Sequence, residues 1–288
     1  MKIIVIGNSG QLARALVRRS QGRVASFGRP RVDLRNSSGI DLIKTERPDV
    51  VINAAAHTAV DKAETEYTLA FRLNAEAPGE IAAAAQDVGA AMIQVSTDYV
   101  FSGEKASPYV EHDAVSPINV YGASKLAGEQ RVVANNERAM VLRTSWVYGA
   151  QGGNFVRTML RLAKSRGAVR VVSDQFGGPT FVDDLADVVL ALSEQPQARG
   201  LYHCGGPEFA SWAGFAEEIF KQSAARGGPA AKVESISAAE FPTPAKRPVN
   251  SRLNSARLAT DHGMRLRGFS EALIDCLDQI SADDWSVE

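Results

Sequence analysis

Uninterrupted apolar runs recur along the first half of the chain, each followed by a stretch whose apolar residues repeat at helical spacing. Such runs, rich in Val, Ile and Ala, are typical of strands buried on both faces of a parallel sheet. They occupy residues 2–6, 49–56, 91–98 and 139–146, and the more polar stretch 23–29 is predicted as a further strand. The stretches between them predict helices from residue 12, from 61 to about 88 with a kink or division near Pro78, and from 116 to about 136. Strands alternating with helices predict an α/β fold with a doubly wound parallel sheet.

The pattern changes after residue 149. Helices are expected at 154–166, 182–193 and 211–225, short strands at 169–172 and 201–204, and a closing helix at 273–280. Residues 241–248 are proline-rich, so an extended segment lying over a surface is expected there. These features predict a first domain over residues 1–150 and a smaller C-terminal α/β lobe over 151–288, with some segments returning to the first domain.

The first strand runs straight into a glycine turn and a helix. Gly7 and Gly10 open this turn, and Ala13 stands where a third glycine is often found. Glycines let the backbone turn tightly and let a pyrophosphate approach the helix N-terminus, where free N–H groups favour anions. A glycine turn can also be only a turn. At the start of a strand–turn–helix unit, however, it favours a dinucleotide site in a Rossmann-like sheet.

The end of the second strand bears on which dinucleotide is bound. An acid there usually holds the ribose hydroxyls of NADH, whereas an arginine suits the 2′-phosphate of NADPH. Here the strand ends in Gly28-Arg29, and the first acid is Asp33. The sequence therefore favours NADPH over NADH, and the alternative is that Arg29 is only a solvated surface residue.

Candidate catalytic residues follow the fourth strand and open the next helix. Thr97 and Asp98 end an apolar strand, and ligands of open α/β sheets bind at the carboxyl ends of strands. Tyr121 and Lys125 lie one helical turn apart on one face. A lysine beside a phenol is expected to lower a tyrosine pKa that is ordinarily about 10, which suits proton transfer to a carbonyl oxygen. Strand-end capping and a surface helix pair are the alternatives.

Composition excludes several other classes of protein. The 288 residues carry a formal net charge of −1, which gives no reason to expect nucleic acid or an anionic membrane as partner. The 2 cysteines and 4 histidines show no disulfide framework and no metal-ligand spacing, so no metal site is predicted. The N-terminus leaves no room for a secretory signal, and no apolar run approaches the roughly 20 residues that span a bilayer. We expect a soluble, cytoplasmic protein.

These motifs together resemble the extended short-chain dehydrogenase/reductase family. The resemblance rests on Gly7-x-x-Gly10, Ser96-Thr97-Asp98 and Tyr121-x-x-x-Lys125, and on longer strings at residues 53–64, 96–101, 143–148 and 247–253. Those strings are similar to the members that complete dTDP-L-rhamnose synthesis. The resemblance implies an oxidoreductase that uses NADPH, with NADH also accepted, to reduce the 4-keto group of dTDP-4-dehydro-L-rhamnose.

The resemblance also implies a site. Its catalytic residues are Thr97, Tyr121 and Lys125, and its sugar contacts are Thr97, Asp98 and Trp146. Its cofactor contacts are Gly10, Gln11, Leu12, Ala56, His57, Thr58, Tyr121 and Lys125. To these we add Gly7 from the glycine turn, and Arg29, Asp33 and Leu34 from the region after the second strand.

Arg247 is a further candidate, chosen on physical grounds. A sugar nucleotide carries a diphosphate, and the planar guanidinium group suits phosphate oxygens. Arg247 lies between Pro244 and Pro248, on a backbone that proline holds extended. We expect it to bind the substrate diphosphate; the alternative is a solvated arginine on a surface loop.

Two positions depart from the relatives. Members that dehydrate sugar nucleotides carry Glu directly after Thr-Asp, and this chain has Tyr99 there, so dehydration is not expected. The family is also associated with magnesium held by glutamates at a dimer contact, but the matching position is Ala15, so a magnesium-linked dimer is not expected.

A homodimer without metal stays open. So do two other functions: reduction of another nucleotide-linked 4-keto-6-deoxyhexose, and an NADP-binding regulatory subunit without turnover.

Overall fold

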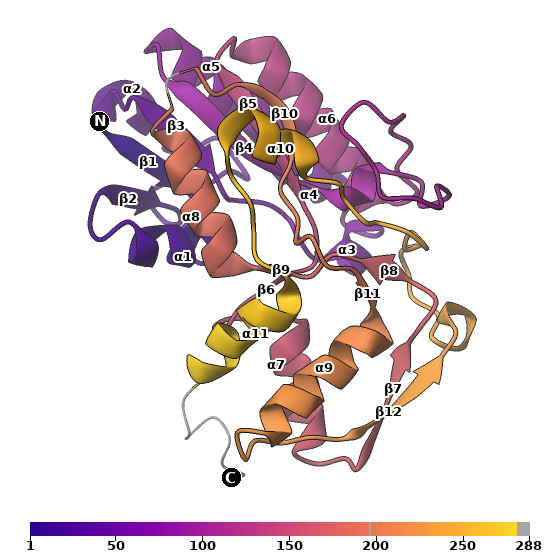
Figure 1. Cartoon of the computed structure of the whole chain (residues 1–288). Coiled ribbons are helices and arrows are strands. Elements are labelled where there is room, and N and C mark those ends of the chain that lie inside the picture. The colour runs from indigo at the N-terminus through magenta and orange to yellow at the C-terminus, as the bar shows by residue number, and fades with distance from the viewer. Residues whose placement is uncertain (196, 281–288) are drawn as a thin grey trace.

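The structure, a computed structural model, describes residues 1–195 and 197–280. Its centre is a parallel six-stranded sheet in the order β10-β5-β4-β3-β1-β2 (Figure 1). The strands are β1 (Ile3–Ile6), β2 (Val24–Phe27), β3 (Val50–Asn53), β4 (Ala91–Thr97), β5 (Ala139–Thr144) and β10 (Gly200–His203). The predicted doubly wound α/β fold is confirmed.

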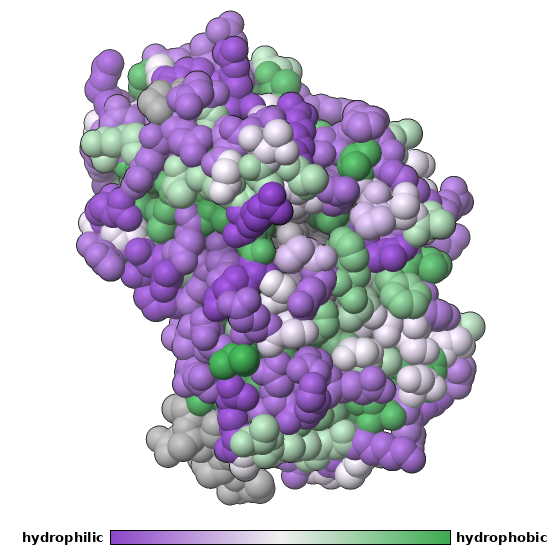
Figure 2. Space-filling view, in the orientation of Figure 1, coloured by the Kyte–Doolittle hydropathy of each residue, from purple (hydrophilic) through white to green (hydrophobic). Residues whose placement is uncertain are grey.

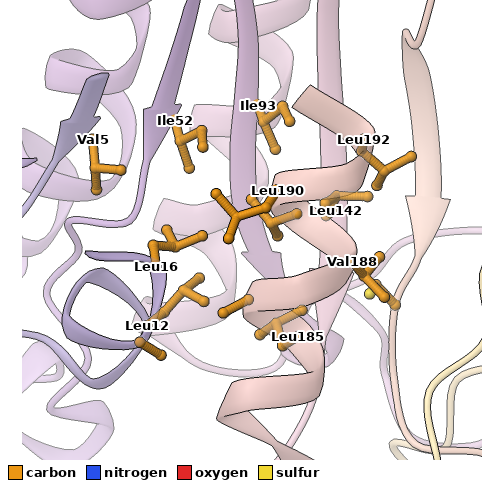
Figure 3. Close-up of a cluster of buried hydrophobic side chains, with 14 of the residues drawn as sticks. Val5, Leu12, Leu16, Ile52, Ile93, Leu142, Leu185, Val188, Leu190 and Leu192 are labelled. Atoms are coloured by element: carbon orange, nitrogen blue, oxygen red, sulfur yellow. The ribbon is translucent and has the colours of Figure 1, made fainter. Parts of the chain in front are cut away.

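Both faces of this sheet are buried, because successive side chains of a strand point to opposite faces. On one face Val5, Ile52, Ile93 and Leu142 pack against helices α1 (Gln11–Arg19) and α8 (Val182–Ser193), as Figure 3 shows. On the other face the alternate residues pack against α2 (Leu42–Glu46), α5 (Ala77–Asp87) and α6 (Val120–Asn135). Most of the surface seen in Figure 2 is hydrophilic, as expected when the apolar residues fill the interior.

The helical stretch expected from residue 61 to 88 is divided. It forms α3 (Val60–Ala63), α4 (Tyr67–Phe71), a π-helical turn (Arg72–Glu76) and then α5. Pro78 has no N–H to give the carbonyl of Asn74, four residues earlier, so the α-helical pattern is interrupted there. A side chain at Gly128 would come within 2.0 Å of that carbonyl oxygen, so glycine lets helix α6 approach this turn.

Helix α6 (Val120–Asn135) carries the Tyr121–Lys125 pair. It begins later than expected, because the Asn119 side chain caps it by accepting a hydrogen bond from the Gly122 N–H, at 2.7 Å. Before it, a 3₁₀ turn (Asp98–Val100) follows β4. None of the described helices is long and apolar enough to span a membrane.

A second hydrophobic cluster lies below the sheet in Figure 1. Its helices are α7 (Phe155–Ala163), α9 (Trp212–Ala224) and α11 (Phe269–Asp278), and its main strands, β7 (Ala168–Val172) and β12 (Lys232–Ile236), are paired in parallel. Short pairs join this region together: β6 (Val147–Tyr148) with β9 (Thr180–Phe181), and β8 (Phe176–Gly177) with β11 (Ala210–Ser211). A further 3₁₀ turn spans Ala238–Glu240.

Helix α8, strand β10 and helix α10 (Ala256–His262) lie in or against the central sheet, although they come from the second half of the chain. The division of the chain at residue 150 stays a prediction, and residues 281–288 of the predicted second lobe lie outside the described residues.

Candidate active site

A cavity of about 820 Å³ opens at the carboxyl ends of β1, β3, β4 and β5. The sheet order changes direction at β1, because β2 lies on one side of it and β3 on the other. Ligands of open α/β sheets bind at such a point. Most of the residues expected at the site line this cavity: Gly7, Gly10, Gln11, Leu12, Arg29, Asp33, Leu34, Ala56, Thr58, Thr97, Asp98, Tyr121, Lys125 and Trp146.

The glycine turn fits a pyrophosphate. Gly7 has a φ of 113°, which favours glycine, and a side chain there would lie 3.2 Å from the backbone nitrogen of Ala55. Gly10 caps helix α1, and no described side chain accepts a hydrogen bond from the helix's first N–H groups. These N–H groups are therefore available to an anion, which is the arrangement that a dinucleotide needs.

Two arginines lie near the end of β2. Arg29 and Arg35 both line the cavity, on either side of Asp33 in the sequence. Hydrogen bonds from Arg35 hold the pKa of the Asp33 carboxyl down to about 2. Nothing in the local sequence singles out Arg35, because its place on the cavity depends on how the loop after β2 folds back.

The Thr97 hydroxyl is the centre of the polar contacts at the other end of the cavity. It donates a hydrogen bond to Oδ1 of Asp98 at 2.9 Å, and it accepts one from the backbone N–H of Tyr99 at 3.2 Å. It also interacts with the phenol of Tyr121, which lines the same cavity. The end of β4 and the start of α6 therefore bring the three side chains together.

The expected effect of Lys125 on Tyr121 is wrong for this structure. Burial raises the pKa of Tyr121 to about 12, and the charge of Asp98 adds to this increase. Thr97, rather than Lys125, opposes this increase in the pKa. Lys125 instead donates to the backbone carbonyl of Val95 at 2.7 Å, and burial lowers its own pKa to about 8. Helical spacing placed the two residues correctly, but it did not reveal how deeply both would be buried.

Trp146 forms the wall of the cavity towards the second hydrophobic cluster. Its backbone is left-handed, with a φ of 46°, which is uncommon for a residue with a large side chain. Its ring stacks on Trp212, with 3.4 Å between centroids and 3° between planes. A side chain at Gly177 would lie 2.3 Å from Trp146 Cε2. Trp212 also lines the cavity, and the sequence did not indicate it, because α9 reaches the site only through tertiary packing.

Two expected site residues are not among those that line the cavity. Asn74 bonds both backbone polar groups of His57, whose imidazole Nε2 lies 2.7 Å from Glu66. Arg247 donates to Asp61 at 2.8 and 3.1 Å, and its side chain is 23% exposed. The segment that carries Arg247 is extended, as expected, but the arginine already has a carboxylate partner and is not simply a solvated surface residue.

Ala15, which matches the position linked to magnesium in the relatives, does not face the surface. Ala15 is fully buried on the face of α1 that packs against the sheet. A side chain at this position points into the core, so it cannot offer a ligand at the surface. Within residues 1–195 and 197–280, no group of three or more His, Cys, Asp or Glu could hold a metal ion.

Comparison with known proteins is consistent with this geometry. The family model described as RmlD substrate binding domain matches residues 1–282. The chain belongs to the RmlD family of dTDP-4-dehydrorhamnose reductases. The reductase of Sinorhizobium fredii is 43% identical over 283 residues, covering 94% of this chain and 95% of the relative.

Solved structures of the family share the fold. The reductase of Clostridium acetobutylicum has a TM-score of 0.92 at 41% identity, covering 96% of this chain and 99% of the other. The reductase of Bacillus anthracis, solved in complex with NADP, has a TM-score of 0.91 at 36% identity, covering 97% and 100%.

Proposed function

We propose that this chain reduces the 4-keto group of dTDP-4-dehydro-L-rhamnose with NADPH, giving dTDP-L-rhamnose. The observation that carries the proposal is that Thr97, Tyr121 and Lys125 line the same cavity as the glycine turn after β1. A dinucleotide held at that turn can extend to the catalytic side chains. Membership of the family supplies the reaction, and a family member has been solved with NADP.

The residues of the cavity divide into two ends. The N–H groups at the start of α1 bind the pyrophosphate, Arg29 binds the 2′-phosphate, and Asp33, Leu34, Ala56 and Thr58 line the path of the cofactor. Lys125 holds the nicotinamide ribose. NADPH supplies the hydride that goes to C4 of the sugar.

Tyr121 supplies the proton. As charge develops on O4, the phenol donates its proton to that oxygen, and Thr97 donates a second hydrogen bond. Fixed donors that point to a developing oxyanion contribute most of the reduction in the barrier at such sites. The raised pKa of Tyr121, about 12, keeps the phenol protonated at neutral pH, which is the form that a reduction requires.

The sugar and the diphosphate occupy the side of the cavity near Trp146. The Trp146–Trp212 stack gives this side a rigid aromatic wall. We keep Arg247 as a candidate for the diphosphate, which it would bind by exchanging Asp61 for phosphate oxygens and turning towards the cavity. Arg247→Ala should raise KM for the sugar nucleotide by about tenfold or more, the effect of losing a charged hydrogen bond of about 1.5–3 kcal/mol. Asp61→Asn is the matched control: it frees Arg247 and should not raise that KM.

The decisive assay follows NADPH absorbance with dTDP-4-dehydro-L-rhamnose and identifies the product. Turnover that requires the sugar nucleotide, with dTDP-L-rhamnose as product, supports the proposal. NADPH binding without turnover on any nucleotide-linked keto sugar would instead indicate a regulatory subunit. Faster turnover of a different 4-keto-6-deoxyhexose would move the assignment to that sugar. A homodimer in solution stays a prediction.

A further inference from the structure

The turn of residues 33–38, which follows β2, brings Arg35 to the cavity. Asp33 and Ser38 close this turn through both backbone groups: the Asp33 N–H donates to the Ser38 carbonyl at 2.8 Å, and the Ser38 N–H donates to the Asp33 carbonyl at 3.1 Å. The Arg35 N–H donates to Oδ1 of Asp33 at 3.1 Å. Asp33, Leu34 and Arg35 all line the cavity, so a closed turn carries three residues that a bound dinucleotide can contact.

Arg72, in the π-helical turn, fixes this loop to α5. Its Nε donates to the carbonyl of Leu34 at 2.9 Å, and its Nη2 donates to the hydroxyl of Ser37 at 2.9 Å. Glu80 accepts two further hydrogen bonds from it, at 2.7 and 2.6 Å. The Arg72 side chain is only 14% exposed. The turn therefore has a buried anchor, and binding a ligand to a fixed set of groups costs less conformational entropy.

Asp33 occupies only part of the Arg35 guanidinium group. Nε lies 2.9 and 3.0 Å from the two carboxylate oxygens, and Nη2 also donates to Oδ2. Nη1 donates to none of the described residues, and the Arg35 side chain is 55% exposed. A guanidinium group has five N–H donors in a planar fork, so Arg35 can hold Asp33 and still donate to a second anion.

The pair changes what Asp33 can do for a dinucleotide. An unpaired acid near the end of the second strand accepts the ribose hydroxyls of NADH and repels a 2′-phosphate. Here hydrogen bonds from Arg35 hold the pKa of the Asp33 carboxyl down to about 2, so at neutral pH its negative charge is present and is balanced by the arginine. Arg29 lines the cavity as well, so this end carries two guanidinium groups against one carboxylate.

We propose that Arg35 selects the cofactor: it holds Asp33 and donates its remaining N–H groups to the 2′-phosphate of NADPH, beside Arg29. This role rests on the proposed function, because it concerns the cofactor of that reaction. Asp33 is then the residue that favours NADH once Arg35 is removed. Discrimination between the two cofactors depends on this pair as well as on Arg29.

The test is calorimetric titration of the wild type and of Arg35→Ala with NADPH and with NADH, which differ only in the 2′-phosphate. The wild type should bind NADPH more tightly. In Arg35→Ala the Kd for NADPH should rise by about tenfold or more, the effect of losing a charged hydrogen bond. NADH should bind as tightly as in the wild type or more tightly, because the released Asp33 carboxylate can accept the ribose hydroxyls.

Two further variants separate this contact from a general loss of positive charge. Arg31→Ala removes a cation from the same loop, but Arg31 is not among the residues that line the cavity and lies over the Phe27 ring, 4.7 Å from its centroid. This control should leave the ratio of the two Kd values unchanged. Arg35→Ala combined with Asp33→Asn removes the unpaired carboxylate, so NADPH should bind about threefold or more tightly than to Arg35→Ala alone. Thermal unfolding reports whether each variant is folded.

Equal Kd ratios in Arg35→Ala and Arg31→Ala would overturn this role of Arg35. So would a double variant that binds NADPH no better than Arg35→Ala, or a wild type that binds the two cofactors equally. These titrations need no sugar nucleotide. A wild type that shows the expected cofactor selection but reduces no nucleotide-linked keto sugar would therefore overturn the proposed function, and the two failures are distinguishable.

Discussion

Glu129 and Arg143 form a buried ion pair between α6 and β5, and removing one partner should be strongly destabilising. Arg143 donates to the two carboxylate oxygens of Glu129 at 2.9 and 2.7 Å, and the side chains are only 4% and 7% exposed. Nη1 of Arg143 has no hydrogen-bond partner among the described residues, so one donor of the guanidinium group is already unsatisfied. Glu129→Gln keeps the shape but leaves the guanidinium charge uncompensated, which typically costs about 3–5 kcal/mol.

Guanidinium chloride unfolding, followed by tryptophan fluorescence, measures this cost. We would compare the wild type with Glu129→Gln, Arg143→Met and the double variant. The double variant should be less destabilised than the sum of the single variants, because it contains no unpaired buried charge. Glu194→Gln, at an exposed pair with Arg23, should leave the free energy of unfolding close to wild type.

A loss below about 1 kcal/mol in Glu129→Gln, or strict additivity in the double variant, would contradict this reasoning.

Glu129→Gln should also change the pH dependence of the reaction. The negative charge of Glu129 raises the pKa of Lys125, which burial lowers to about 8. Without that charge the pKa of Lys125 should fall further, so the decline of kcat that is expected when Lys125 loses its proton should begin at a lower pH.

Three further substitutions test the site. Tyr121→Phe should lower kcat by about 10²–10⁴-fold, the usual contribution of a positioned general acid, with little change in NADPH affinity; near-normal turnover would remove Tyr121 from the mechanism. Arg29→Ala should weaken binding of NADPH by about 1.5–3 kcal/mol and that of NADH much less, and equal effects on both in a binding titration would show that Arg29 does not contact the 2′-phosphate. Gly177→Ala should displace Trp146, because the new methyl group would lie 2.3 Å from Cε2, and should cost about 1–3 kcal/mol of stability with a higher sugar KM; unchanged tryptophan fluorescence and KM would contradict it.

Much of the site could be predicted because the signals are local. A buried parallel strand needs an unbroken apolar run, and a glycine turn needs glycine where φ is positive, as at Gly7. Strand ends and helical spacing then located Thr97, Asp98, Tyr121 and Lys125, which all line the cavity. All of these follow from the backbone geometry of short stretches, which one sequence contains.

Burial and distant partners depended on the tertiary structure. The sequence shows that Tyr121 and Lys125 are neighbours, but only packing shows that burial, rather than the lysine charge, controls the pKa of the tyrosine. Arg247 and Asp61 are 186 residues apart, so no local pattern could pair them. Strand β12, Lys232–Ile236, was not predicted because it is short and mostly polar and exposed. It forms a strand by pairing with β7. In each case the environment of the residue is set by contacts between segments that are far apart in the sequence. Such contacts exist only in the folded chain.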